Sequence, residues 1–405
     1  MNVLMISPGF PEDLAFFTRG LAQTGVNVLG VGDQSVRALH EDARSGLTDY
    51  LQVASLWEED TVASEIQEWL GGRRVERVEC LWEPGVVLAA KLRAALGAPG
   101  INVDQAFAFR DKDRMKAVLD EAGIRTPKHA RASTSEQIRE YAEAIGFPII
   151  IKPIDGAGSA DTYSIRSEEE LDQALRLIGH VPEVSVEEFI EGEEYTYDTV
   201  CANGDVLFDN ISWYRPKPLT ARLNPWISPQ AISLRDTESE VYQKGRELGH
   251  DVLRALGFDT GFTHMEWFLK ADGEAVFGEI GARAPGGRLT HAMNYSADID
   301  LFQHWGEAIA FGRTSQDTRK KYNAAIVFKR AVGSGRIKAH EGLAGLLGRY
   351  GEYVVHMDLN PIGAPVKDYR KIVTGDGWIV VRHPDLEATL ELADAFTTDF
   401  RMIAE

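Results

Sequence analysis

The decisive stretch of this chain reads Thr263-His264-Met265-Glu266-Trp267-Phe268 and then, after a short gap, Gly278-Glu279-Ile280-Gly281-Ala282-Arg283-Ala284-Pro285-Gly286-Gly287. Between the two runs stands Asp272-Gly273, a strong hairpin signal between segments rich in aromatic and branched residues. Pairing around this turn would bring Glu266 and Glu279 near each other on adjacent strands.

Two neighbouring carboxylates repel unless a cation lies between them, and Mg²⁺ accepts carboxylate oxygens together with substrate phosphates. Arg283 follows Glu279 within reach of the same site, and its guanidinium group suits a phosphoryl or carboxylate group. By itself this pattern leaves two interpretations open. It is either a magnesium and phosphate site or a solvated sheet face.

Length and composition narrow the class of protein. A chain of 405 residues predicts two or three domains. The net charge of −19 argues against binding to nucleic acid or to an anionic membrane and favours a small-molecule enzyme. We find no apolar run of bilayer length and no basic flank typical of a signal peptide, so a cytoplasmic protein without a membrane partner is expected.

Strand-like and helix-like runs alternate through the first hundred residues, which predicts a parallel sheet covered by helices. Glu83 follows the strand expected at Val78–Trp82, where open parallel sheets place ligand contacts. An equally good reading is a helix N-terminal charge beside Pro84.

Lys152 ends a run of three isoleucines, which predicts a buried strand that delivers one charge at its end. A loop of small residues follows, from Asp155 to Asp161. Its glycines would let backbone N–H groups approach phosphate oxygens, although a plain hairpin turn is the simpler interpretation. Further on, Trp213–Pro229 includes Pro216, Pro218 and Pro225 and predicts a long ordered loop rather than a helix or strand.

Taken in order, these motifs resemble the ATP-grasp superfamily, and within it the carboxylate–amine ligases of the L-amino-acid ligase type, relatives of biotin carboxylase. The resemblance implies an α/β and α+β chain with an ATP-grasp fold. It implies a Rossmann-like parallel domain at residues 1–108, two lobes at 109–183 and 184–312, and a small C-terminal α+β domain at 313–405.

The resemblance also implies roles for individual residues. Arg283 and Lys152 would be catalytic, and Glu266 and Glu279 would hold Mg²⁺, or Mn²⁺ in its place. The nucleotide ATP would be bound by Lys112, Lys152, Gly156, Gly158, Ser159, Glu187, Glu188, Ile190 and Glu194. One position departs from the pattern: Gly281 stands where many relatives have an asparagine that completes the metal shell.

Substrate recognition is less marked in the sequence. An acidic protein must concentrate positive charge where acids bind, so Arg215, Arg222 and Arg288 are candidates for holding a substrate carboxylate. Any one of them could instead pair with a surface acid. Glu83 is a further substrate candidate, and both Glu83 and His291 are candidates for a general base.

The expected function is ATP-dependent joining of a carboxylate to an amine through an acyl phosphate. Carboxylation with bicarbonate, as in biotin carboxylase or purine-pathway enzymes, is one alternative, and a nucleotide-binding module without catalysis is another. A homodimer is expected from the relatives alone.

Overall fold

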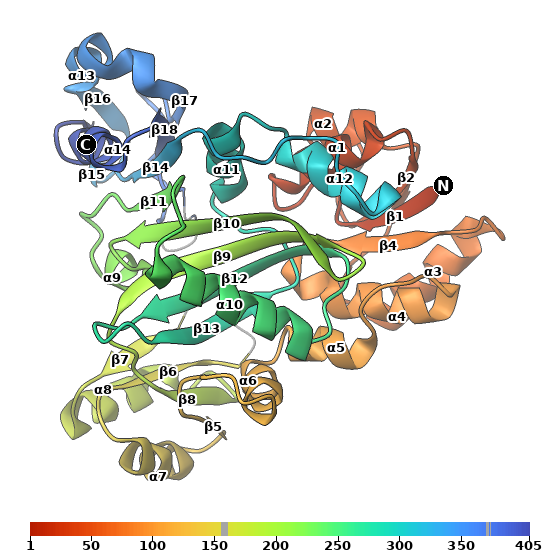
Figure 1. Cartoon of the computed structure of the whole chain (residues 1–405), viewed down its shortest axis with the longest axis horizontal. Helices are drawn as coiled ribbons and strands as arrows, with labels where there is room; N and C mark the ends of the chain where they lie inside the picture. Colours follow the sequence, from red (N-terminus) through yellow and green to blue (C-terminus); the bar gives the residue numbers. More distant parts are fainter. Residues whose placement is uncertain (155–160, 370–371, 373) are drawn as a thin grey trace.

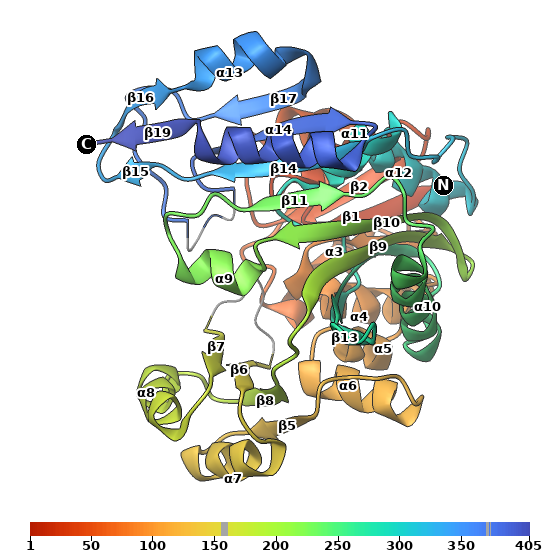
Figure 2. The same cartoon turned by 60° about the vertical axis from the view of Figure 1, so that its left-hand side comes forward.

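The computed structural model describes residues 1–154, 161–369, 372 and 374–405. The strands of these residues form four sheets (Figure 1). Figure 2 shows a small sheet at the bottom and the C-terminal strands at the top, with a large sheet between them. No helix in the described part of the chain is both long enough and apolar enough to cross a membrane.

The N-terminal sheet is parallel and has the strand order β3-β2-β1-β4. Its central strand carries Val3 to Ile6, all fully buried, which is typical of a parallel sheet covered on both faces. The strands are β1 (Asn2–Ile6), β2 (Asn27–Gly32), β3 (Asp49–Gln52) and β4 (Arg77–Cys80). The helices of this region are α1 (Leu14–Ala22), α2 (Glu41–Gly46), α3 (Glu59–Leu70), α4 (Val86–Leu96) and α5 (Val103–Ala108), with a short 3₁₀ turn η1 (Glu83–Gly85).

The small sheet is antiparallel and has the order β5-β8-β6-β7. Ile149 and Ile151 of β6 are fully buried in its core, so the apolar run before Lys152 is a buried strand as expected. The strands are β5 (His129–Ala132), β6 (Ile149–Pro153), β7 (Tyr163–Ile165) and β8 (Val184–Glu188). Helix α6 (Lys112–Glu121) leads into this sheet, and α7 (Ser135–Ile145) and α8 (Glu168–Ile178) pack on it.

The large sheet has the order β13-β12-β9-β10-β11-β14-β18-β17. Its strands are β9 (Glu193–Ala202), β10 (Asp205–Arg215), β11 (Gln230–Ser233), β12 (Gly261–Leu269), β13 (Ala275–Gly281), β14 (Asn323–Lys329), β17 (Val354–Leu359) and β18 (Gly377–His383). Four helices contact it, namely α10 (Glu240–Ala255), α11 (Leu289–Ala297), α12 (Leu301–Phe311) and α14 (Leu386–Thr398). Because β14 pairs with β11, this sheet runs on past residue 312, and the domain boundary drawn there stays a prediction.

The remaining strands lie near the C-terminus as a three-stranded sheet of order β15-β19-β16. They are β15 (Val332–Gly333), β16 (Ile337–Glu341) and β19 (Arg401–Ala404), accompanied by α13 (Leu343–Tyr350) and the 3₁₀ turn η2 (Gly351–Tyr353).

The prediction of a long loop at Trp213–Pro229 was wrong in part. Strand β10 continues to Arg215, and a short helix α9 (Pro218–Leu223) follows. A proline in the first turn does not interrupt a helix, because that position needs no N–H donor. Pro218 therefore marks where this helix starts.

Candidate active site

The hairpin expected from the opening stretch is present. Strands β12 and β13 pair antiparallel, and Glu266 stands directly opposite Glu279. Directly opposed residues project from the same face of a sheet, so the two carboxylates lie side by side. The register shifts next to Glu266 and leaves Gly278 outside the regular pairing. A Cβ atom at Gly278 would lie 2.8 Å from the backbone oxygen of Glu266, which explains the glycine.

A cavity of about 940 Å³ lies between the small sheet and the large sheet. Lys152 and Glu187 line it from the small sheet, and Glu194, Glu266 and Glu279 line it from the large one. Its volume is at the upper end of what ligand sites in proteins usually enclose. The cavity is therefore large enough for a nucleotide together with a small substrate.

Two lysines face the carboxylate of Glu279. The Nζ atoms of Lys112 and Lys152 lie 3.4 Å and 4.0 Å from its Oε2 atom. Burial alone would raise the pKa of Glu279, but Lys112 and Lys152 lower it to about 2. Burial likewise opposes the charge of Lys152, yet Glu187 and Glu279 raise its pKa. Both groups are thus charged at neutral pH.

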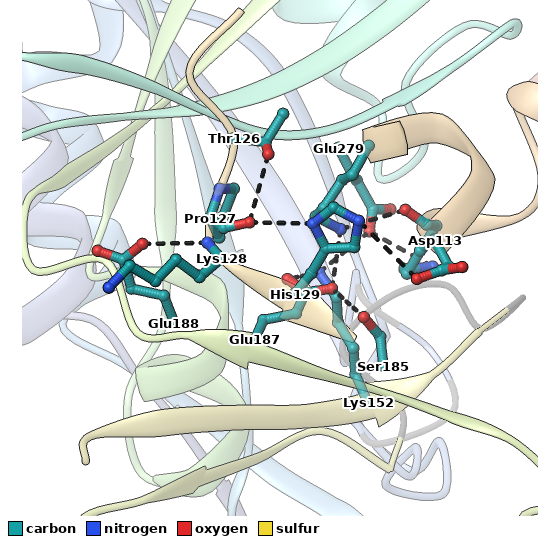
Figure 3. A network of polar contacts seen from close by, with 12 residues as sticks. Asp113, Thr126, Pro127, Lys128, His129, Lys152, Ser185, Glu187, Glu188 and Glu279 are labelled. Carbon is teal, nitrogen blue, oxygen red and sulfur yellow. Dashed lines mark hydrogen bonds and ion pairs between the residues drawn. The ribbon is translucent and has the colours of Figure 1, made fainter. Parts of the chain in front are cut away.

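Glu187 is held by groups inside the protein. Its carboxylate accepts hydrogen bonds from Lys116 Nζ at 2.8 Å and from Ser185 Oγ at 2.7 Å, and Lys152 Nζ lies 3.0 Å away. Figure 3 shows Ser185, Glu187, Lys152 and Glu279 close together. Burial raises the pKa of Glu187, but the two lysines lower it well below its usual range. These partners all come from within the protein, and Glu187 also lines the cavity, so its part in nucleotide binding stays a prediction.

Lys116 is a residue that the sequence reasoning missed. Its side chain is fully buried, and burial lowers its pKa to about 8 despite the ion pair with Glu187. One signal was available: Lys116 follows Lys112 by four positions on α6, so both lie on the same face of that helix.

The strand end after Glu187 lies at the edge of the cavity. Glu188 and Ile190 both line it. The Glu188 carboxylate accepts hydrogen bonds from Arg125 Nη2 at 3.0 Å and 3.1 Å. It also accepts one from the backbone N–H of Lys128 at 3.1 Å (Figure 3). Ile190 is only 7% exposed and gives this edge an apolar surface.

Glu194 is buried on β9 near the metal-ligand candidates. Burial raises its pKa well above the ordinary value, and the charges of Glu266 and Glu279 raise it further. Several carboxylates therefore converge on one wall of the cavity, and a cation there would relieve their repulsion. Within the described residues, no group of three or more His, Cys, Asp or Glu side chains is arranged to hold a metal ion.

Arg283 is anchored from the N-terminal sheet. Its Nε atom donates to Glu83 Oε2 at 2.7 Å, and Arg110 forms an ion pair with the other oxygen of Glu83. Burial raises the pKa of Glu83, but Arg283 and Arg110 lower it below its usual value. The Glu83 carboxylate is thus charged, paired with two arginines, and holds Arg283 in place. A general base would instead be expected to lack such compensating cations.

His264 lies beside Glu266 on β12 and had no assigned role. Its Nδ1 atom lies 2.6 Å from Asp198 Oδ1, and its Nε2 atom lies 3.7 Å from Glu266 Oε1. Burial alone would lower the pKa of His264, but the Asp198 carboxylate raises it to about 9.

The candidates for substrate binding differ in their surroundings. Arg222 and Arg215 line the cavity, but Arg215 also bonds to both oxygens of Asp394 on α14. Arg288 pairs instead with Asp13 and with Glu12, whose Oε2 atom lies 2.8 Å away. Arg215 and Arg288 therefore have acidic partners within the protein.

His291 packs among the aromatic rings of Phe16, Phe302 and Trp378, with centroid separations of 5.0, 5.2 and 5.8 Å. Burial lowers its pKa to about 3, and Arg288 lowers it further. A neutral ring of this kind is a weak base. The loop candidates Gly156, Gly158 and Ser159 lie outside the described residues.

Comparison with known proteins identifies the family. A model of the ATP-grasp domain matches residues 145–291, which include the small-sheet strands β6 to β8 and the hairpin β12–β13. Residues 145–291 therefore form an ATP-grasp domain. This confirms the fold class and the family expected from the sequence.

Two curated relatives align with most of this chain. It is 26% identical over 312 residues to the L-arginine-specific L-amino acid ligase of Bacillus subtilis, covering 75% of this chain and 74% of that protein. It is 24% identical over 329 residues to the alanine–anticapsin ligase of the same organism, covering 74% and 70%. Among solved structures, an L-amino acid ligase from Bacillus licheniformis superposes with a TM-score of 0.79 at 20% identity, covering 100% of this chain and 98% of that one.

Proposed function

We propose that this chain is an ATP-dependent carboxylate–amine ligase in which an amino acid is one of the two substrates or both. The acid would be activated as an acyl phosphate. The amine would then displace the phosphate and form an amide or dipeptide-like bond, with release of ADP and phosphate. The ATP-grasp match and the two relatives named as amino-acid ligases support this function.

One observation carries the proposal. Glu266 and Glu279 stand opposite each other in the same cavity as Lys152 and Arg283. The main barrier to acyl phosphate formation is the repulsion between the substrate carboxylate and the transferred phosphoryl group. Cations fixed in place before the reaction offset this repulsion, because no reorganisation is needed when charge develops.

Residues on the two sheets would contact different parts of ATP and the substrate. Lys152 of the small sheet, held between Glu187 and Glu279, would contact the phosphate oxygens of ATP. Arg283, held by Glu83, would face the reacting groups from the large sheet. Lys112 and Ile190 would bind the nucleotide, and Glu194 would meet the ribose hydroxyls.

The pair Glu266 and Glu279 fits a magnesium ion, or a manganese ion in its place. Both are carboxylates at the cavity wall, which is the donor type that these ions prefer. When bound, the ion would neutralise charge on the nucleotide phosphates. Gly281, at the position of the usual asparagine, has no side chain to offer, so substrate phosphates and water would complete the shell.

A screen of ADP release over pairs of amino acids tests the proposal. The assay contains ATP and Mg²⁺, and mass spectrometry identifies the product. We expect ADP release that depends on two amino substrates and yields an amide of their summed mass less one water. The matched Arg283→Ala variant is expected to be inactive.

Other outcomes would decide against ligation. ADP release that requires bicarbonate would support the carboxylation alternative. Nucleotide binding without ADP release for any pair, and without release on addition of bicarbonate, would support a non-catalytic module. We further propose that the protein is a homodimer and lies in the cytoplasm. Sedimentation analysis would test the dimer, and cell fractionation would test the location.

A further inference from the structure

A row of buried polar side chains crosses the large sheet behind Glu266. His264 of β12 stands opposite Asp198 of β9, and Asp198 stands opposite Asn210 of β10. All three are at most 7% exposed. Buried polar groups cost free energy unless they are hydrogen-bonded, so a row of them in a sheet core calls for an explanation.

The contacts along this row are continuous. Asp198 Oδ1 lies 2.6 Å from His264 Nδ1, and Asp198 Oδ2 accepts from Asn210 Nδ2 at 3.1 Å. Asn210 Oδ1 accepts from Ser233 Oγ of β11 at 2.5 Å and from the ammonium group of Lys320. Lys320 Nζ also donates to the backbone oxygen of Leu234 at 2.8 Å.

Each contact sets the orientation of the next group. The Lys320 ammonium group attracts the amide oxygen of Asn210, which turns the amide nitrogen toward Asp198. Asp198 in turn engages Nδ1 of His264, so the other ring nitrogen faces Glu266 at 3.7 Å. A carboxylate partner fixes the ring of a metal-ligating histidine in this way, and ligating carboxylates are likewise held by outer partners.

We propose that these four side chains form a positioning relay that fixes the carboxylate of Glu266. The relay consists of His264, Asp198, Asn210 and Lys320. It rests on the proposed function, in which Glu266 holds the metal ion. His264 lines the cavity. In this proposal the four side chains act through Glu266 and not on the reacting atoms.

Binding of Mn²⁺ to the protein–ADP complex, followed by electron paramagnetic resonance, tests the relay without turnover. His264→Gln is expected to weaken Mn²⁺ binding about tenfold or more, as removal of such outer partners does. Lys320→Met is expected to weaken it by a smaller factor, whereas Lys320→Arg, which keeps the charge, should bind Mn²⁺ nearly as wild type does. ADP binding measured without metal should be unchanged in all three variants.

The double variant His264→Gln/Lys320→Met decides whether Lys320 acts through His264. In a relay the effects do not add, so the double variant should bind Mn²⁺ as weakly as His264→Gln alone. Additive effects, or an unchanged Mn²⁺ affinity in His264→Gln, would overturn the relay. If Lys320→Met does not fold, Asp198→Asn replaces it in the same cycle with the same expectation.

A control variant lies on the same two strands. Thr263 of β12 and Thr199 of β9 share a buried hydrogen bond of 2.6 Å, one position away from the relay and therefore on the opposite face of the sheet. Thr263→Val should lower thermal stability but leave Mn²⁺ affinity unchanged. A wild-type complex that binds no Mn²⁺ would contradict the metal site itself, a result separate from failure of the relay.

Discussion

Arg283 donates a hydrogen bond of 2.7 Å from Nε to Glu83, a residue of the N-terminal region 200 positions earlier in the chain. Both side chains are less than one-fifth exposed. Arg110 pairs with the same carboxylate, so Glu83 holds two guanidinium groups at once. The N-terminal region thereby orients the guanidinium group of Arg283, which follows strand β13 of the hairpin.

The Glu83→Gln variant tests this anchoring. It keeps the size of the side chain but removes the charge, and a hydrogen bond to a charged group contributes about 1.5–3 kcal/mol. We expect kcat for ADP release to fall about 10- to 100-fold. Glu79→Gln is the control, because Glu79 is also buried on β4 and faces Arg93 at 3.9 Å. It should alter stability and leave kcat near wild type.

The Glu279→Gln variant tests the metal-site carboxylate. An amide cannot supply the same charge between Lys112 and Lys152, and loss of one fixed electrostatic contact typically costs about 100-fold or more in rate. ADP release should fall by at least that factor while the circular dichroism spectrum is unchanged. The control is Glu274→Gln in the turn of the same hairpin. Near-normal turnover of Glu279→Gln would mean that the metal site is misplaced.

Local patterns in the sequence were sufficient for much of the fold. The run of three isoleucines before Lys152 is the buried strand Ile149–Pro153, as expected, because an apolar pattern acts over a few neighbours. The opposition of Glu266 and Glu279 also followed from a local turn signal.

Long-range contacts could not be predicted in this way. A lysine on a helix normally marks a solvated face, so the burial of Lys116 against Glu187 has no local signature. The acidic partners of Arg215 and Arg288 come from distant segments, and only the tertiary fold brings them near. Short-range rules do not report which charges are already paired.

Loss of Lys116 should lower stability more than activity. In Lys116→Met, Glu187 keeps Lys152 and Ser185 but loses a buried partner at 2.8 Å. Breaking a buried ion pair costs about 3–5 kcal/mol of folding stability. Because Glu187 keeps two partners, we expect a loss near the lower end of this range. The midpoint of thermal unfolding should fall clearly, and KM for ATP should rise as Lys152 shifts. Lys244→Met is the control, because Lys244 is a partly exposed lysine whose side chain is 41% accessible. Equal stability of the two variants would contradict the assignment.

His291 predicts a pH dependence of stability. Burial, with a smaller effect of Arg288, lowers its folded-state pKa to about 3, below the ordinary value of 6.5. Between these values the unfolded chain binds the extra proton, so this contribution is fully present above about pH 6.5 and is lost as pH falls toward 3. The slope is at most about 1.4 kcal/mol per pH unit. Denaturant unfolding at pH 7, 6 and 5 should show a smaller slope for His291→Phe than for wild type. Identical slopes would contradict the neutral buried ring.

Gly281→Asn restores the residue type that many ATP-grasp proteins have at this position, yet we expect it to impair this one. A Cβ atom at Gly281 would lie 3.2 Å from Cγ of Arg283, closer than ordinary contact, so the Arg283 side chain must move. Displacing a positioned guanidinium group should lower kcat about tenfold or more. Gly345→Ala is the control, because its Cβ atom would meet nothing within 4 Å. A higher kcat in Gly281→Asn would contradict this explanation. It would mean that the missing metal ligand limits the reaction, and not that Arg283 needs the space beside Gly281.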